Sequence, residues 1–195
     1  MLAIVLSRRD FREYDQIVSL YTREWGKREA FARGVKKISS KNAASLMPFS
    51  LLEVEIVPGK EIDHLTKAQP VKIFANIISD LEKIMVVQYA GKLLDEFILP
   101  HERDERIFNL LAGFLDFINE AEKIASLNLA ASFILKLWDC FGFGSQDKKY
   151  EAWLKSDWAA VSMLKEAEAE AYKHACEYAE FHSGHKLARL NSYVP

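Results

Sequence analysis

The chain has 195 residues, of which 50% are hydrophobic and 28% are charged, and its formal net charge is -2. A chain of this length and apolar content can bury one or two cores, so we expect an ordered globular protein. The near-neutral total excludes the uniformly basic composition that is the usual footprint of a nucleic-acid-binding domain.

The charge is distributed unevenly along the chain. Residues 1–75 carry 13 Lys and Arg against 9 Asp and Glu, whereas residues 76–195 carry 13 against 19. Within Arg8–Lys41 there are 10 basic and 5 acidic residues. Such a segment can produce a local field that attracts phosphate, although an ordinary solvated surface has the same composition.

Cysteine content and hydropathy indicate the cellular compartment in which we expect the protein. The chain has two cysteines, Cys140 and Cys176, and they form no C-x-x-C pair. We therefore expect neither a disulfide framework nor a structural zinc, and we expect the protein to lie in a reducing cytoplasm. The apolar start Leu2–Leu6 has its charges after it, unlike a signal peptide. No apolar run has the length of a membrane helix, so we expect no membrane partner.

The first part of the chain reads as five short strands around one core. Gly26 can supply the positive φ of a hairpin between the second and third strands, with Trp25 and Lys27 at its tip. The polar stretch Lys36–Asn42 predicts a mobile basic loop. Five strands predict a partly open Greek-key barrel of the OB type, and an SH3-like barrel fits nearly as well. The predicted strands are Leu2–Ser7, Gln16–Thr22, Glu29–Val35, Phe49–Val57 and Glu61–Lys67.

From about Ile73 the apolar residues recur at three- and four-residue spacing, which predicts helices. The expected helices run from there to Pro100, over 107–118, over 129–137, over 150–155 and over 164–182. We therefore predict a two-domain protein, all-β followed by all-α, with an OB-fold domain over residues 1–72 and a helical bundle over residues 73–195.

The motifs of common active sites are missing from the sequence. It has no phosphate-binding glycine loop, dinucleotide fingerprint or nucleophile elbow. His174 and His182 share a helical face, but Glu177 or Glu180 makes only a weak third zinc ligand. We expect a binding protein without catalytic residues, metal or cofactor.

The order of residues resembles the RecO family of bacterial recombination mediators. The motifs are the apolar strand and basic turn of Ile4–Phe11, the Gly-plus-basic loop of Ala32–Lys37, the Leu-x-Pro-Phe strand of Leu46–Val54, and Leu65–Ala68. The helical half is similar mainly through Gly142-Phe143 and Tyr178–Leu187. It departs from the family at two places. Many relatives carry a four-cysteine zinc module just after the residue corresponding to Phe143, where this chain has no cysteine. Relatives also often have arginine just before the residue corresponding to Phe133, where this chain has Ala131-Ser132.

The resemblance implies a protein of DNA repair and recombination in the cytoplasm, at the nucleoid. Such a protein binds single- and double-stranded DNA, anneals complementary strands and contacts the C-terminal tail of the single-stranded-DNA-binding protein. With a RecR-type partner it helps to load a RecA-type recombinase. None of these steps requires bond chemistry.

Candidate residues follow from this interpretation. The aromatic residues Phe11, Tyr14, Tyr21, Trp25 and Phe31 can stack unpaired bases, but Tyr21 and Phe31 are better read as core. Trp25 is the favoured stacking residue, or else a contact for the RecR-type partner. Flexible cations neutralise phosphates, and the DNA-binding candidates are Arg8, Arg9, Arg12, Trp25, Lys27, Arg28, Arg33, Lys36, Lys37 and Lys41. The expected rim of a site for the acidic tail is Lys136, Lys173, Lys186 and Arg189.

Two other functions stay open. The chain could serve as a protein-docking module of the recombination machinery with weak DNA affinity of its own. It could also be an oligosaccharide-binding or enzymatic barrel protein, which would need convergent polar groups in a concave site.

Overall fold

The computed structural model describes residues 1–37, 46–164 and 168–190. Its packing groups the chain into two units. The barrel unit comprises residues 1–74 and 91–112, and the helical unit comprises residues 75–90 and 113–195. The predicted boundary at residue 72 follows the change from strands to helices, whereas the packing also assigns residues 91–112 to the barrel unit.

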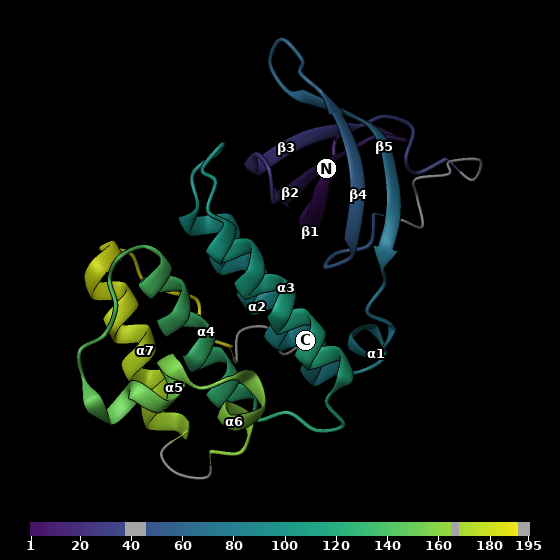
Figure 1. Ribbon diagram of the computed structural model, residues 1–195. Helices are drawn as coiled ribbons and strands as arrows, with labels where there is room; N and C mark the ends of the chain where they lie inside the picture. The colour runs from purple at the N-terminus through teal and green to yellow at the C-terminus, as the bar shows by residue number, and fades with distance from the viewer. Residues whose placement is uncertain (38–45, 165–167, 191–195) are drawn as a thin grey trace. The chain divides into compact units, whose positions relative to one another are not determined.

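Five strands close into a barrel in the order β1-β2-β3-β5-β4 (Figure 1). All pairs are antiparallel except β3 and β5, which pair in parallel through Ala30 with Asp63 and Phe31 with His64. This confirms the prediction of a five-stranded OB-type barrel followed by helices. The strands are β1 (Leu2–Asp10), β2 (Gln16–Thr22), β3 (Gly26–Ala32), β4 (Leu51–Val57) and β5 (Asp63–Lys72).

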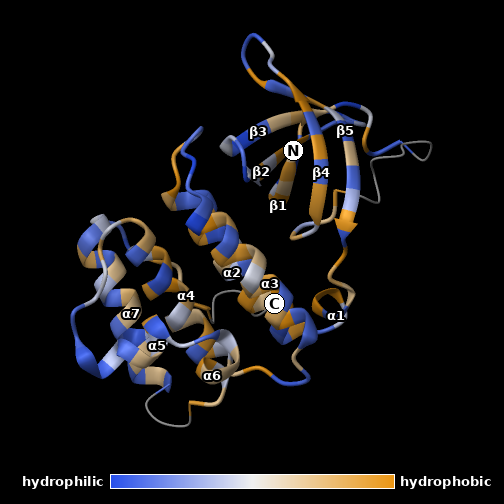
Figure 2. Ribbon diagram, viewed as in Figure 1, coloured by the Kyte–Doolittle hydropathy of each residue, from blue (hydrophilic) through white to orange (hydrophobic). Residues whose placement is uncertain are grey.

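The barrel core is built from alternate residues of each strand. Along β4, Leu52, Val54 and Ile56 are buried and the glutamates between them are exposed, an alternation that Figure 2 shows in colour. On β3, Ala30 and Ala32 belong to this core. The side chains of Lys27, Glu29 and Phe31 therefore lie on the outer face of β3.

The strand bounds differ from the predictions mainly at their ends. β2 has its predicted bounds, whereas β1 extends to Asp10 and β5 to Lys72 because both stay paired with a neighbour beyond their last core residue. β3 begins and ends three residues earlier than predicted, because Gly26 already pairs with Thr22. Lys27 is therefore a strand residue and not part of the hairpin tip.

Gly26 has the predicted positive φ, of 68°, and a second reason to be glycine. A Cβ there would lie 1.9 Å from the Glu102 carbonyl oxygen of the α2–α3 loop. That loop runs along the start of β3: the Lys27 N–H donates to the Glu102 carbonyl at 3.3 Å, and the His101 N–H donates to the Lys27 carbonyl at 2.8 Å.

Polar side chains fasten residues 91–112 to the barrel. Asp95 accepts hydrogen bonds from Ser7 at 3.0 Å and Ser19 at 2.8 Å, and its carboxylate lies 3.1 Å from the Lys27 ammonium. The buried Tyr21 hydroxyl exchanges two hydrogen bonds of 3.1 Å with the backbone of Asp104. These contacts place residues 91–112 over the end of the outer face where β3 begins, at Lys27.

In the helical unit α4 is buried nearly all round, and Phe133 packs on Phe114 and Trp158. The helix predicted to end at Pro100 is divided at Asp80, whose carboxylate accepts the N–H groups of Glu82 and Lys83 and so begins a new helix. A short helix around Trp158 was not predicted. The helices are α1 (Ala75–Ile78), α2 (Leu81–Phe97), α3 (Glu105–Glu120), α4 (Ser126–Cys140), α5 (Glu151–Lys155), α6 (Trp158–Ser162) and α7 (Glu168–Ser183), with a 3-10 turn over Lys148–Tyr150.

Within the described ranges no helix combines the length and the apolar character needed to cross a membrane.

Candidate nucleic-acid interface

Two loops meet at the end of the barrel where β1 and β3 finish. The Lys36 N–H donates to the Tyr14 carbonyl of the β1–β2 connection at 3.0 Å. The Asp15 carboxylate accepts the Gly34 N–H at 2.7 Å. These bonds hold the turn over residues 33–37 against the connection over residues 11–15, so cations from two separate stretches of sequence come together.

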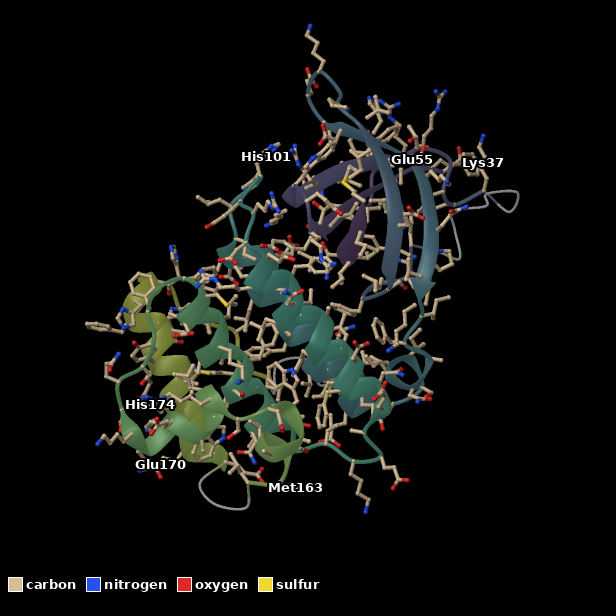
Figure 3. All side chains as sticks on the ribbon, viewed as in Figure 1. Lys37, Glu55, His101, Met163, Glu170 and His174 are labelled. Atoms are coloured by element: carbon tan, nitrogen blue, oxygen red, sulfur yellow. The ribbon has the colours of Figure 1, made fainter. Side chains whose placement is uncertain are left out.

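We call this group of side chains the cationic end. All of its members are exposed, and Figure 3 shows Lys37 projecting away from the barrel. Exposed, flexible ammonium and guanidinium groups are the groups that neutralise DNA phosphates. The cationic end consists of Arg8, Arg9, Arg12, Arg33, Lys36 and Lys37.

Acidic side chains partly neutralise this end. Lys36 pairs with Asp10 at 2.6 Å, and Arg9 pairs with Glu29 at 3.4 Å. The amide of Gln16 and the ammonium of Lys36 hold the pKa of Asp10 below its usual value. Exposed ion pairs of this kind are weak, so a phosphate can replace the carboxylate as partner of the cation.

Four predicted DNA-binding residues are not part of the cationic end. The side chain of Lys27 is 11% exposed and is held by Asp95. Arg28 is 20% exposed, pairs with Asp63 at 3.3 Å and lies 5.3 Å from the Trp25 ring centre. Lys41 lies outside the described residues. Their assignment to DNA binding stays a prediction, and we leave them out of the surface proposed below.

Aromatic side chains accompany the cations. Arg12 lies over the Phe11 ring at 5.2 Å, and Lys37 lies over the Tyr14 ring at 5.6 Å. Tyr21 is buried, as predicted, but Phe31 is only half-buried on the outer face, so its assignment to the core was wrong. The strand alternation with Ala30 and Ala32 was the signal that would have placed it outside.

The barrel unit has a cavity of about 510 Å³ at the other end of β3. Three carboxylates, of Glu29, Glu61 and Asp63, line it together with Lys27 and Arg28. Because the three carboxylates outnumber the two cations, whose own ion pairs are largely buried, this cavity is unfavourable for phosphate. His101, labelled in Figure 3, also lines it, on the α2–α3 loop.

The predicted partner-binding residues are in different environments within the helical unit. Lys136 donates to the carbonyls of Leu154 at 2.7 Å and Ser156 at 2.8 Å, and burial lowers its pKa. It therefore serves the fold. Lys173 pairs loosely with Glu177 at 3.8 Å, Arg189 pairs with Glu180 at 3.1 Å, and Lys186 is exposed.

The histidines of α7 take part in aromatic packing. The ring of His174 stacks on Tyr150 with 3.7 Å between ring centres, and His182 lies 4.9 Å from Phe143. Across the residues that the structure places, no three His, Cys, Asp or Glu side chains are grouped as a metal site would require.

Two family models match the chain in succession. The model of the recombination protein O N terminal domain matches residues 1–74, and that of the C-terminal domain matches residues 78–146. The chain belongs to the RecO family. The barrel and the cationic end lie within the first RecO match, and α2, α3 and α4 lie within the second.

Curated relatives carry the description DNA repair protein RecO. The chain is 33% identical over 124 residues to that of Geobacter metallireducens, which covers 64% of this chain and 51% of the relative. It is 35% identical to that of Desulforamulus reducens over 60% of this chain and 45% of the relative, and 34% identical to that of Symbiobacterium thermophilum over 72% and 55%. The chain spans about half the length of these curated relatives.

Proposed function

We propose that this RecO-family DNA repair protein is a non-enzymatic recombination mediator that binds single- and double-stranded DNA through the cationic end. The observation that carries the proposal is the convergence of six exposed cations, from the end of β1 and from two loops, at one end of an OB-type barrel. In OB folds the face of strands 2 and 3 and the loops between strands 1 and 2 and between strands 4 and 5 commonly bind oligonucleotides.

Annealing is the activity that this surface suits best. A protein that anneals two strands neutralises both phosphate chains and leaves the base edges available for pairing. Flexible cations do this without reading sequence, and each phosphate contact made by a lysine contributes to affinity irrespective of the base.

We further propose that the chain works with a RecR-type protein and helps to load a RecA-type recombinase onto DNA coated by single-stranded-DNA-binding protein. The acidic tail of the latter protein calls for exposed cations on the helical unit, and Lys173 and Lys186 have the exposure that such a rim requires. Lys136 is left out because its ammonium is used within the fold.

The test is salt-dependent DNA binding by the double variant Lys36→Glu/Lys37→Glu, followed by fluorescence anisotropy of a labelled oligonucleotide. We expect affinity to fall at least about tenfold at low salt and the salt dependence to flatten, because two phosphate contacts are lost. The rate of annealing of complementary strands should fall with it.

The matched control is Lys173→Glu/Lys186→Glu, which changes the net charge equally on the helical unit. It should leave DNA affinity within about twofold, because exposed charges that do not contact a phosphate are screened by salt and contribute little. Equal losses in both variants would show a nonspecific effect of net charge. A wild-type chain that binds no DNA at low salt would favour the docking-module hypothesis instead.

A further inference from the structure

Three aromatic rings form a continuous row on the outer face of the barrel. Phe31 of β3 stands between Phe11 of the β1–β2 connection, at 5.7 Å between ring centres, and His64 of β5, at 5.8 Å. The interplanar angles are 82° and 84°, so both contacts are edge-to-face. The row spans the connection, β3 and β5, and it begins at the cationic end.

The rings at both ends of the row are open to solvent. Phe11 is 50% exposed and His64 is exposed. An edge-to-face contact occupies at most one face of a ring, so each of these two rings keeps a face that the row itself does not cover. The guanidinium of Arg12 accompanies Phe11, and guanidinium planes also stack on bases.

Exposed rings interleaved with cations are what a single strand requires, because its bases stack while its phosphates bind to cations. We propose that Phe11, Phe31 and His64 form a stacking platform for the unpaired bases of a DNA strand whose phosphates contact the cationic end. This inference rests on the proposed function and adds the class of ligand, unpaired nucleobases, and the residues that hold them.

Trp25, the aromatic residue favoured from the sequence, is a poorer platform. Trp25 is less exposed than Phe11, at 38%, and the cation beside its ring, Arg28, is held in a largely buried ion pair with Asp63. Arg28 lines the cavity that holds three carboxylates, where a phosphate chain is disfavoured. Phe11, by contrast, lies between Asp10 and Arg12, and the cation over its ring is Arg12, an exposed member of the cationic end.

A short platform has a functional consequence for annealing. Bases in a duplex are paired and stacked on each other, so they cannot also stack on protein rings. The platform therefore favours the single strand and loses its hold when the strand pairs. The cations stay bound to either form, because they contact phosphates only.

The test compares the full chain with the double variant Phe11→Ala/His64→Ala on three probes of equal length: oligothymidylate, an abasic sugar-phosphate strand, and a duplex. We expect the variant to lose about five- to hundredfold in affinity for oligothymidylate. The abasic strand and the duplex should change less than about twofold, and the salt dependence for oligothymidylate should keep its slope.

Two further variants separate stacking from packing. Phe11→Leu/His64→Leu keeps apolar bulk beside Phe31 and should lose nearly as much affinity for oligothymidylate as the alanine variant. Trp25→Ala should behave like wild type on all three probes. Equal losses on the three probes, unchanged binding of oligothymidylate, or full activity of the leucine variant would each overturn the platform. An absence of DNA binding by the wild-type chain would overturn the proposed function itself.

Discussion

The two ends of the barrel's outer face carry similar cations with different environments. At one end Lys27 is 11% exposed and lies 3.1 Å from the Asp95 carboxylate, under residues 91–112. At the other end Lys36 is 38% exposed, and its carboxylate partner, Asp10, is itself 63% exposed. Both lysines belong to the same basic stretch of sequence, so composition alone does not separate a cation of the fold from a cation of the surface.

We call the end of the outer face at Lys27 the closed end and the end at Lys36 the open end. At the closed end a lysine donates hydrogen bonds to carbonyls at the end of a helix, and this arrangement recurs in the chain. Lys27 donates to the carbonyls of Asp95 and Ile98 near the end of α2. Lys83 donates to the Ala121 carbonyl just after α3, and Lys136 donates to two carbonyls at the end of α5. The last carbonyls of a helix lack intrahelical partners and carry partial negative charge, so a buried or partly buried ammonium satisfies them.

The largest expected effect concerns Lys27. Lys27→Met removes the ammonium that neutralises Asp95 and donates to two carbonyls. We expect the free energy of unfolding to fall by about 2–3 kcal/mol, discounted because Asp95 remains partly solvated and keeps its two serine donors. Urea denaturation followed by circular dichroism measures this loss.

The matched control is Lys36→Met at the open end. It should cost less than about 0.5 kcal/mol of stability, because exposed ion pairs contribute little, but it should weaken DNA binding. Similar stability losses in the two variants would erase the distinction between the closed and open ends.

The fold was largely predictable from the sequence because the periods of two and of about 3.6 residues are local signals. Gly26 marked the β2–β3 hairpin, and the change near Ile73 marked the first helix. The packing of residues 91–112 with the barrel was not predictable, since it depends on Asp95 and Asp104 meeting Lys27 and Tyr21 across long stretches of chain. α6 was missed because five residues are too few to show a period.

The candidate site was predictable as a stretch of sequence but not as a surface. Six of the cations between Arg8 and Lys37 are brought together as exposed side chains, but Lys27 and Arg28 are held in largely buried ion pairs. His64 was missed because it lies on β5, and only the register of β3 with β5 places it beside Phe31. The sequence also carries no signal that Lys136 reaches the end of α5.

The next effect concerns Lys136 and depends on pH. Lys136→Met removes two hydrogen bonds to carbonyls but also removes a partly buried charge, so we expect a loss of only about 1 kcal/mol at neutral pH. Burial lowers the pKa of Lys136 below 10.5, so above that lowered pKa the unfolded chain binds more protons than the folded chain. The stabilisation of the folded state by Lys136 therefore rises with pH. It is fully present above about pH 10.5 and declines as the pH falls through the folded pKa.

Urea denaturation at neutral pH and at about pH 9.5 therefore should show the difference between wild type and Lys136→Met growing with pH. Lys173→Met is the control: its ion pair with Glu177 is long, at 3.8 Å, and exposed, so its cost should stay below about 0.5 kcal/mol. A difference for Lys136→Met that shrinks with rising pH would contradict the buried-charge interpretation.

The smallest effect returns to the open end. Asp10 competes with phosphate for Lys36, and its lowered pKa keeps it ionised at neutral pH. Asp10→Asn removes that competing charge and should strengthen binding of oligothymidylate about two- to fivefold at low salt, an amount typical of one exposed pair.

Glu122→Gln makes the same change of net charge at an exposed position of the helical unit and should leave the affinity unchanged. Fluorescence anisotropy over a salt series measures both, and the gain should disappear at high salt because the interaction is screened. A weaker-binding Asp10→Asn chain would mean that Asp10 orients Lys36 toward DNA instead of competing with it.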